Sequence, residues 1–361
     1  MKLFKIILLL LTSTPFYSQE LAVESKPLPL TKSFTTYKNK VFCLKSDGKI
    51  DIWDVNEMDK TNVIKKDKFN TIYLGTKHGA VFKLDPTDLK LTLYNNKSTL
   101  IDRGDYDIFF NSKNELFLMS GYGIHAIEKG KKWSKFDQSG TMVSLCNNVY
   151  SRKKQKNWEP KCTKFFFIMP DTIYKDKNGI IWMSKSYGEW RHEYHRFDIE
   201  QAAILKPKGD YMINPHYLFE DSFGTIYGTS GSMHFSQSGS ISIIENNEVI
   251  KSINSTELTD KKGKILFKEG MMIGPSTYNK FNRKFYFSTS SGIYSADLVK
   301  NNFINFELIF NPTLNWQQEP LAIGYSMSYE KLDFIDIDQL LFLTSNNGLG
   351  LYSNKKIKWL N

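Results

Sequence analysis

The sequence contains few of the features that mark membrane proteins or well-known catalytic families. Its unbroken apolar run from Ile6 to Leu11 is far shorter than a transmembrane helix, which needs about 20 apolar residues. No later stretch comes close to that length. The chain also has no Walker loop, Gly-x-Ser-x-Gly, Cys-x-x-Cys or EF-hand loop, so the nucleotide, hydrolase, redox and calcium sites that these motifs mark are not expected. We expect no cofactor.

Cysteine is scarce, with three in 361 residues. Cys146 and Cys162 flank a lysine-rich segment, 147–161, without hydrophobic periodicity. We interpret this segment as a loop, and a disulfide closing it would stabilise the protein by about 3 kcal/mol in the chain-entropy model. Cys43 lies between Phe42 and Leu44, which predicts a buried free thiol. The alternative is that all three cysteines are free and buried, because spacing does not establish a bond.

The N-terminus has the pattern of a signal peptide. Lys2 and Lys5 precede the apolar run, and small and polar residues follow it up to Ser18. We therefore predict a signal peptide over residues 1–18 and one exported domain over residues 19–361, located in the periplasm, at the cell surface or outside the cell. No cysteine follows the run to accept a lipid, and the mature chain should have no stable membrane span. The alternative is an uncleaved N-terminal anchor.

The composition is that of a globular protein rich in strands. Hydrophobic residues make up 41%, charged residues 24% and aromatic residues 14%, and aromatic and β-branched side chains favour sheets. The formal net charge of +10 falls to +8 when Lys2 and Lys5 leave with the signal. That excess either is spread over a solvated surface or attracts an anionic glycan, a lipopolysaccharide-like surface or an acidic partner. For an exported chain we expect no nucleic-acid partner.

One short pattern recurs along the chain. An aromatic residue stands between two apolar neighbours, and a glycine follows it six positions later. The complete pattern occurs at Phe42, Tyr73, Phe117, Trp182, Tyr286 and Phe342, with Gly48, Gly79, Gly123, Gly188, Gly292 and Gly348. An imperfect seventh copy is centred on Tyr227, and its glycine, Gly231, comes early. The apolar triplet predicts a strand, and the glycine predicts a turn with positive φ, so each unit should be a hairpin.

Further strands are expected on both sides of these hairpins, as at Ile108–Phe110 and Ile357–Leu360. Four strands per unit and a mean spacing of 50 residues from Phe42 to Phe342 predict an all-β fold, a seven-bladed β-propeller. Six or eight blades are alternative counts, because long intervals can hide or merge a blade. The long intervals predict inserted loops at 142–166, 204–215, 252–274 and 312–323. Pairing of residues 21–30 with the last blade would close the ring.

The residues around Trp182 and Tyr227 resemble a known repeat. Asp176-Lys177-Asn178-Gly179 and Asp221-Ser222-Phe223-Gly224 each lead into an apolar-aromatic strand. This arrangement is similar to the repeats of two-component regulator propellers, a family of the WD40 and YVTN-like propeller type. The resemblance implies a propeller fold outside the membrane, often as the sensor region of a hybrid kinase. Neither a transmembrane helix nor a kinase is present in this sequence, which departs from that context.

One dense polar cluster is the candidate binding site. It consists of Trp190, Arg191, His192, Glu193, Tyr194 and His195. The cluster is one residue short of the zinc motif His-Glu-x-x-His, and on a strand its two histidines would face opposite sides, so we expect no metal site. As an exposed hairpin tip it would stack its aromatic rings on a sugar; a solvated loop is the alternative.

Two functional hypotheses follow. The first is a non-catalytic recognition or scaffold module that binds a glycan or an envelope protein through the inserted loops and the Trp190 cluster. The second is a carbohydrate-active hydrolase or lyase whose acids lie at the channel mouth, with Glu193, Asp105 and Asp336 as weak candidates. Spacing singles out no carboxylate pair, although different blades of a propeller can supply one. We favour the binding module.

Overall fold

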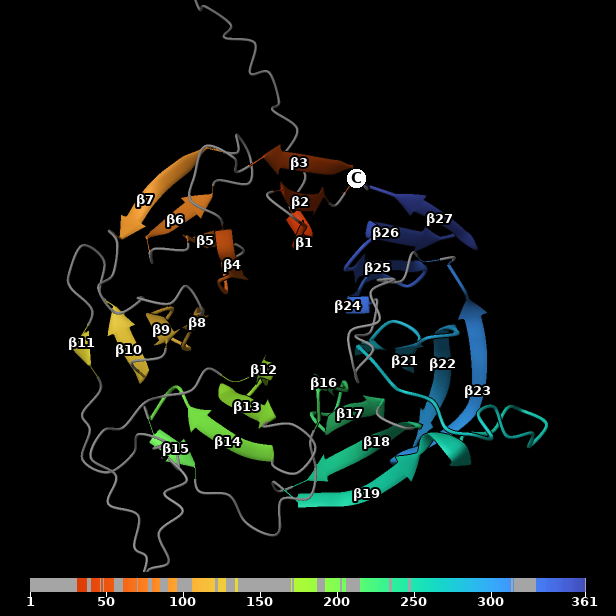
Figure 1. Cartoon of the computed structure of the whole chain (residues 1–361). Helices are drawn as coiled ribbons and strands as arrows, with labels where there is room; N and C mark the ends of the chain where they lie inside the picture. Colours follow the sequence, from red (N-terminus) through yellow and green to blue (C-terminus); the bar gives the residue numbers. More distant parts are fainter. Residues whose placement is uncertain are drawn as a thin grey trace, which may run out of the picture.

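The computed structural model shows seven antiparallel sheets arranged around a central axis (Figure 1). Six of these sheets have four strands, and the first has three described strands. Strand order within each sheet follows the sequence, from an inner to an outer strand. The all-β propeller fold predicted from the sequence is therefore confirmed. The structure describes residues 31–37, 40–45, 47, 49–54, 61–69, 71–76, 80–84, 90–95, 106–120, 123–127, 134–135, 170, 172–186, 192–201, 203–205, 215–233, 236–245, 248–312, 314 and 329–360.

We number the sheets 1 to 7 in chain order. Sheet 1 contains β1 (Thr31–Tyr37), β2 (Lys40–Lys45) and β3 (Ile50–Asp54). Sheet 2 contains β4 (Thr61–Lys66), β5 (Ile72–Thr76), β6 (Val81–Leu84) and β7 (Leu91–Asn95). Sheet 3 contains β8 (Tyr106–Phe110), β9 (Leu116–Ser120), β10 (Gly123–Ile127) and β11 (Ser134–Lys135). Sheet 4 contains β12 (Thr172–Lys175), β13 (Ile180–Ser186), β14 (His192–Asp198) and β15 (Ala203–Leu205).

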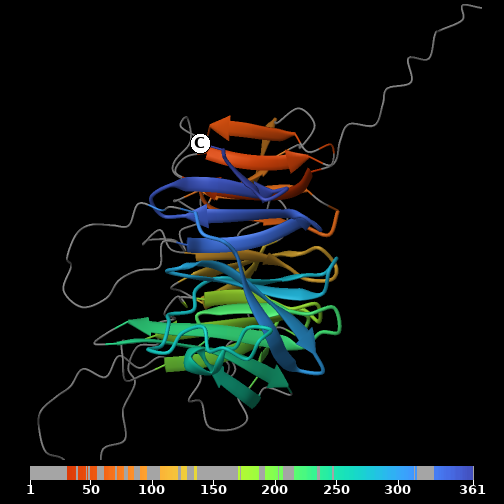
Figure 2. The ribbon, with the colours of Figure 1, turned by 90° about the vertical axis from the view of Figure 1, so that its right-hand side faces the viewer.

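The remaining sheets have the same organisation. Sheet 5 contains β16 (Tyr217–Glu220), β17 (Ile226–Met233), β18 (Gln237–Glu245) and β19 (Glu248–Asn254). Sheet 6 contains β20 (Ser276–Asn279), β21 (Lys284–Thr289), β22 (Gly292–Val299) and β23 (Asn302–Phe310). Sheet 7 contains β24 (Tyr329–Asp336), β25 (Gln339–Thr344), β26 (Gly348–Ser353) and β27 (Lys356–Trp359). Seen from the side, the strands run across the thickness of the ring (Figure 2).

The repeated apolar triplet forms the second strand of every sheet. Both faces of this strand are covered, which is why consecutive residues, and not alternate ones, are buried, as in β5 and β9. The predicted turn conformation is present at Gly292 and Gly348, with φ of 130° and 86°. The seventh copy differs, because Gly231 lies inside β17 opposite Gly239 and not in a turn.

A second repeated feature is the turn between the first and second strands of a sheet. In sheets 2, 4 and 5 an aspartate closes this turn by accepting two backbone N–H bonds. Asp176 Oδ1 accepts them from Asn178 and Ile180 at 2.9 Å each, and Asp67 and Asp221 do the same in their own turns. Such side-chain to backbone bonds are the reason that Asp and Asn favour turns. The Asp-x-x-Gly sequence is thus a structural signal.

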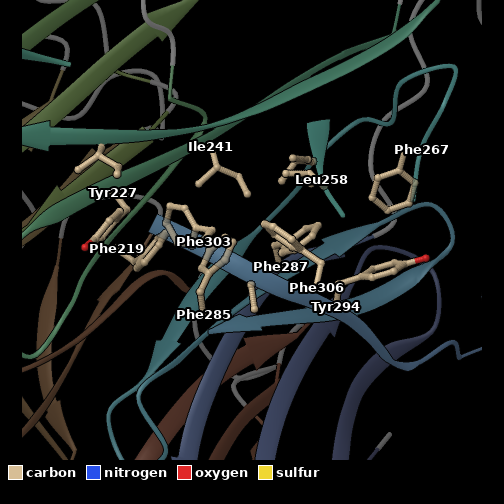
Figure 3. Close-up of a cluster of buried hydrophobic side chains, with 13 residues drawn as sticks. Phe219, Tyr227, Ile241, Leu258, Phe267, Phe285, Phe287, Tyr294, Phe303 and Phe306 are labelled. Carbon is tan, nitrogen blue, oxygen red and sulfur yellow. The ribbon is translucent and has the colours of Figure 1, made fainter. Parts of the chain in front are cut away.

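The core is divided into seven hydrophobic clusters, and each contains residues of two neighbouring sheets. The largest lies between sheets 5 and 6, where Phe219, Phe285 and Phe287 stack (Figure 3). The cluster between sheets 7 and 1 joins Phe42 and Leu44 to Leu341 and other residues of sheet 7. The described residues therefore make apolar contact between every neighbouring pair of sheets, including the first and the last.

Several sequence predictions lie outside the described residues. These are the signal peptide at 1–18, the closing segment 21–30, and Cys146 and Cys162 with the loop between them. Cys43 is described, and it is a buried free thiol as predicted. Among the described residues, no helix is both long and apolar enough to cross a bilayer.

Candidate functional site: the connection face

Strand order gives each sheet two different ends. The hairpin between the second and third strands and the chain leaving the fourth strand emerge at one end, which we call the connection face. The turns between the first and second strands and between the third and fourth strands lie at the other end, the turn face. All four long inter-sheet segments predicted from the sequence leave a fourth strand or enter a first strand. They therefore start from, or arrive at, the connection face.

The predicted binding cluster belongs partly to the hairpin of sheet 4. His192, Glu193, Tyr194 and His195 begin β14 and pair with residues 183–186 of β13. That the two histidines face opposite sides of the strand stays a prediction. Trp190 and Arg191 lie outside the described residues. The described part of the cluster is therefore at the connection face, on a strand and not in a loop.

An inserted loop was predicted at 252–274; residues 252–254 belong to β19 instead, and the segment that follows, 255–275, packs closely on the sheets. It begins with the short 3-10 helix η1 (Ser255–Glu257), and its Leu258 and Ile273 are fully buried in the largest core cluster. The Ser255 hydroxyl accepts a hydrogen bond from the Met271 backbone N–H at 3.0 Å. Leu258 appears beside the aromatic side chains of this cluster in Figure 3. This insertion therefore packs on sheets 5 and 6 and contributes to the core between them.

Two glycines let this segment approach the hairpin of β17 and β18. A Cβ added at Gly239 would lie 2.5 Å from the Met271 carbonyl oxygen, and one added at Gly231 would lie 2.8 Å from the Ile273 carbonyl oxygen. Both distances are too short for a real side chain. The early glycine of the seventh repeat therefore serves close packing. Nearby, the Gln237 side-chain oxygen is buried and accepts no hydrogen bond from any described residue.

The inner strands contribute a second group of polar side chains at the connection face. Tyr217 begins β16, and Glu330 is the second residue of β24. Burial raises the pKa of Tyr217, and the negative charge of Glu330 raises it further. Solvent reaches Glu330, yet the protein around it desolvates the carboxylate enough to raise its pKa. Neither residue was predicted as a site residue, because the two strands are far apart in the sequence and no motif links them.

Of the acids named from the sequence, the two described ones, Glu193 and Asp336, lie at opposite faces of the molecule. Asp336 closes the first turn of sheet 7, where its Oδ1 accepts the Ile337 backbone N–H at 2.8 Å, so it lies at the turn face. Glu193 begins β14 at the connection face, and Asp105 lies outside the described residues. The described His, Cys, Asp and Glu residues include no group of three that could hold a metal ion.

The comparisons with known proteins support the fold. No family model matches the chain, and no curated protein matches it. Among solved structures, the extracellular domain of a putative hybrid two-component system from B. thetaiotaomicron matches with a TM-score of 0.51 and 14% identity over 91% of this chain. This chain spans only 39% of that structure.

Two further structures match over most of both chains. A catalytically inactive virginiamycin B lyase from Staphylococcus aureus with quinupristin has a TM-score of 0.51 and 13% identity, covering 93% of this chain and 98% of its own. YCF48 bound to D1 peptide has a TM-score of 0.52 and 10% identity, covering 90% of this chain and 94% of its own. At these identities the matches establish a shared fold and nothing about activity.

Proposed function

We propose that the protein is an exported seven-bladed propeller that recognises a glycan or a protein of the cell envelope through its connection face. The observation that carries the proposal is the concentration of non-repeated sequence at this one face. The hairpin of sheet 4 and the packed segment 255–275 both lie there. Loops on a rigid scaffold are the usual location of binding residues.

The comparisons are compatible with this role. One neighbour is an extracellular domain, and another is a propeller bound to a peptide. For the present chain, the seven sheets and the seven apolar clusters between them support a ring of seven blades, and the sequence of residues 1–18 supports export. We further propose that the chain is related to the two-component regulator propellers whose repeats it resembles.

Affinity capture from envelope extract, together with a glycan panel, tests the proposal. We expect the wild-type chain to retain one envelope component and a variant with Trp190→Ala and Tyr194→Ala to lose it. Deletion of residues 147–161 tests the basic insertion separately. The matched control is Lys356→Ala, an exposed residue at the turn face, which should leave capture unchanged. Equal capture by all four proteins, or none by any of them, would contradict the proposal.

A second candidate function is a carbohydrate-active hydrolase or lyase. The observation that favours it is the position of Glu330 at the connection face, where desolvation raises the pKa of its carboxyl group, which is the direction that a general acid needs. Glycoside hydrolysis ordinarily needs a second carboxylate within about 5 to 10 Å. Turnover of a polysaccharide panel that Glu330→Gln abolishes, while the fold is retained, would favour the enzyme over the binding module.

A further inference from the structure

The turn face carries an unusual set of exposed side chains that the proposed recognition role does not use. In the first turn of sheets 2, 5 and 6 the second residue after the closing Asp or Asn is phenylalanine: Phe69, Phe223 and Phe281. Their exposed fractions are 69%, 75% and 45%. These rings contribute little to the core, and the same position holds Lys113 and Asn178 in sheets 3 and 4. Folding therefore does not require an aromatic residue at this position.

Lysines accompany these phenylalanines. The Lys68 ammonium lies 5.2 Å from the centroid of the Phe69 ring, and that of Lys280 lies 5.2 Å from the Phe281 ring. Lys177 of sheet 4 donates a hydrogen bond to the Phe223 carbonyl oxygen at 2.8 Å. The Phe69 and Phe281 rings thus each have an ammonium group beside them, whereas at Phe223 the lysine of the neighbouring turn contacts the backbone.

The aspartates that close the first turns of sheets 2, 4 and 5 point inward, whereas Glu115 in the first turn of sheet 3 is exposed. Asp67, Asp176 and Asp221 are each at least 91% buried and use their oxygens to close the turn. The turns are also connected around the ring, since Lys68 donates to the Ser112 carbonyl oxygen at 2.5 Å and Lys177 N–H donates to Glu220 at 3.0 Å. Among the described residues, the exposed charges of the first turns of sheets 2 to 6 are therefore mostly those of lysines, with Glu115 of sheet 3 as an exposed carboxylate and Lys177 paired with Glu220. The surface is bounded at sheet 7, where Asp336 and Asp338 flank the exposed Ile337.

We propose that this set of turn tips, which we call the Lys-Phe ring, docks the protein on an anionic lipid surface. The ring consists of Lys68, Phe69, Lys113, Lys177, Phe223, Lys280 and Phe281. Separate protruding tips do not form the groove that a peptide or a single sugar chain needs. An apolar ring next to an ammonium group fits the bilayer interface, where acyl chains lie just below anionic headgroups. The turn face is opposite the connection face, so docking leaves the proposed recognition site directed away from the lipid.

The test is co-sedimentation of the full chain with vesicles of phosphatidylcholine alone or of phosphatidylcholine and phosphatidylglycerol in equal parts. We expect binding to the mixed vesicles that weakens with added salt. The triple variant Phe69→Ser, Phe223→Ser, Phe281→Ser should lower the partition coefficient by about tenfold. The matched control is Leu93→Ser, Ile250→Ser, Ile304→Ser, which removes three exposed apolar residues from outer strands and should change nothing. Every variant keeps the same N-terminus, so any binding by residues 6–11 is common to all.

A second pair of variants tests the charges. Lys68→Gln, Lys177→Gln, Lys280→Gln should abolish the preference for mixed vesicles, whereas Lys262→Gln, Lys268→Gln, Lys358→Gln, elsewhere on the surface, should preserve it. The proposal is overturned by absent vesicle binding, by equal binding to neutral vesicles, or by equal losses in test and control variants. It is also overturned if the phenylalanine variant loses a captured protein or glycan but keeps vesicle binding. Trp190→Ala with Tyr194→Ala should not alter vesicle binding, so this inference and the recognition role can fail independently.

Discussion

At the scale of single residues, the closing residue of the first turn is matched to the aromatic residue six positions later. Asp176 Oδ2 accepts the Trp182 indole N–H at 2.8 Å, and Asp221 Oδ2 accepts the Tyr227 hydroxyl at 3.1 Å. In sheet 3 the aromatic residue is Phe117, which has no donor, and the closing residue is Asn111, whose side chain bonds Glu115 instead. An aspartate therefore occurs where a buried donor needs an acceptor.

Asp176→Ala should destabilise the protein by about 3 kcal/mol, because it leaves the indole N–H and two turn N–H groups without their acceptor in a buried setting. Urea unfolding measures this change. Asp260→Ala is the control, since Asp260 closes a similar turn in the exposed hairpin of segment 255–275 without an aromatic partner, and its effect should be clearly smaller. Equal losses would show that the aromatic bond contributes nothing.

Cys43 should be unreactive in the folded protein. Burial raises its pKa to about 11, with Lys45 opposing the shift and Asp51 adding to it. The native thiol thus keeps its proton between about pH 9 and pH 11 while the unfolded chain loses it, so stability should fall as pH rises through this window. Mass spectrometry after alkylation at mild alkaline pH should find Cys43 labelled only in urea. Cys43→Ala should lack this part of the pH dependence, and rapid native labelling would contradict the burial.

The sequence predicted the residues of the repeated motifs but not the polar residues Tyr217 and Glu330 at the connection face. The apolar triplets and the Asp-x-x-Gly turns were recognisable because they depend on neighbours in the chain. Tyr217 and Glu330 were missed because they lie on strands far apart in the sequence, and no local pattern reports the electrostatic effect of one on the other. For Trp190 and Arg191 the hypothesis stays a prediction.

At the scale of elements, the hairpin of β17 and β18 is shaped by what lies across it. Gly231 was interpreted as an early turn glycine, whereas it pairs with Gly239 inside the hairpin and makes room for residues 271–273. The repeat pattern shows that this glycine is not at the usual turn position. The reason for its position is the close packing of residues 271–273, which the repeat pattern does not reveal.

Gly239→Val should loosen segment 255–275, because its side chain would collide with the Met271 carbonyl. Hydrogen exchange of residues 255–274 should accelerate, and unfolding should require less urea. Ser238→Val, on the adjacent exposed position of the same strand, supplies the control and should leave exchange unchanged. Unaltered exchange in the Gly239 variant would mean that the segment is not held by this contact.

At the scale of the whole molecule, the repeat length predicted the ring of sheets. The repeats did not predict which residues of the last sheet contact the first sheet. The structure shows this contact: Phe42 of sheet 1 packs in one hydrophobic cluster with residues of sheet 7. The Leu360 N–H also donates to the Leu349 carbonyl oxygen at 2.9 Å and holds the last described residue on sheet 7.

Phe42→Ala should cost about 3 to 5 kcal/mol, similar to Phe287→Ala in the middle of the ring, because both remove a buried ring between two sheets. Denaturant titration followed by circular dichroism and by tryptophan fluorescence provides the measurement. A markedly smaller cost for Phe42→Ala would mean that sheets 7 and 1 are not joined in solution.

The closure has a consequence for how the protein comes apart. In a linear stack of repeats the terminal unit has one neighbour, so unfolding can start by fraying from an end. Here each sheet contacts two others, and every unit must lose two interfaces before it can leave. We therefore expect the ring to resist gradual fraying and to open in a single step, after which the remaining sheets unravel from the two ends so created.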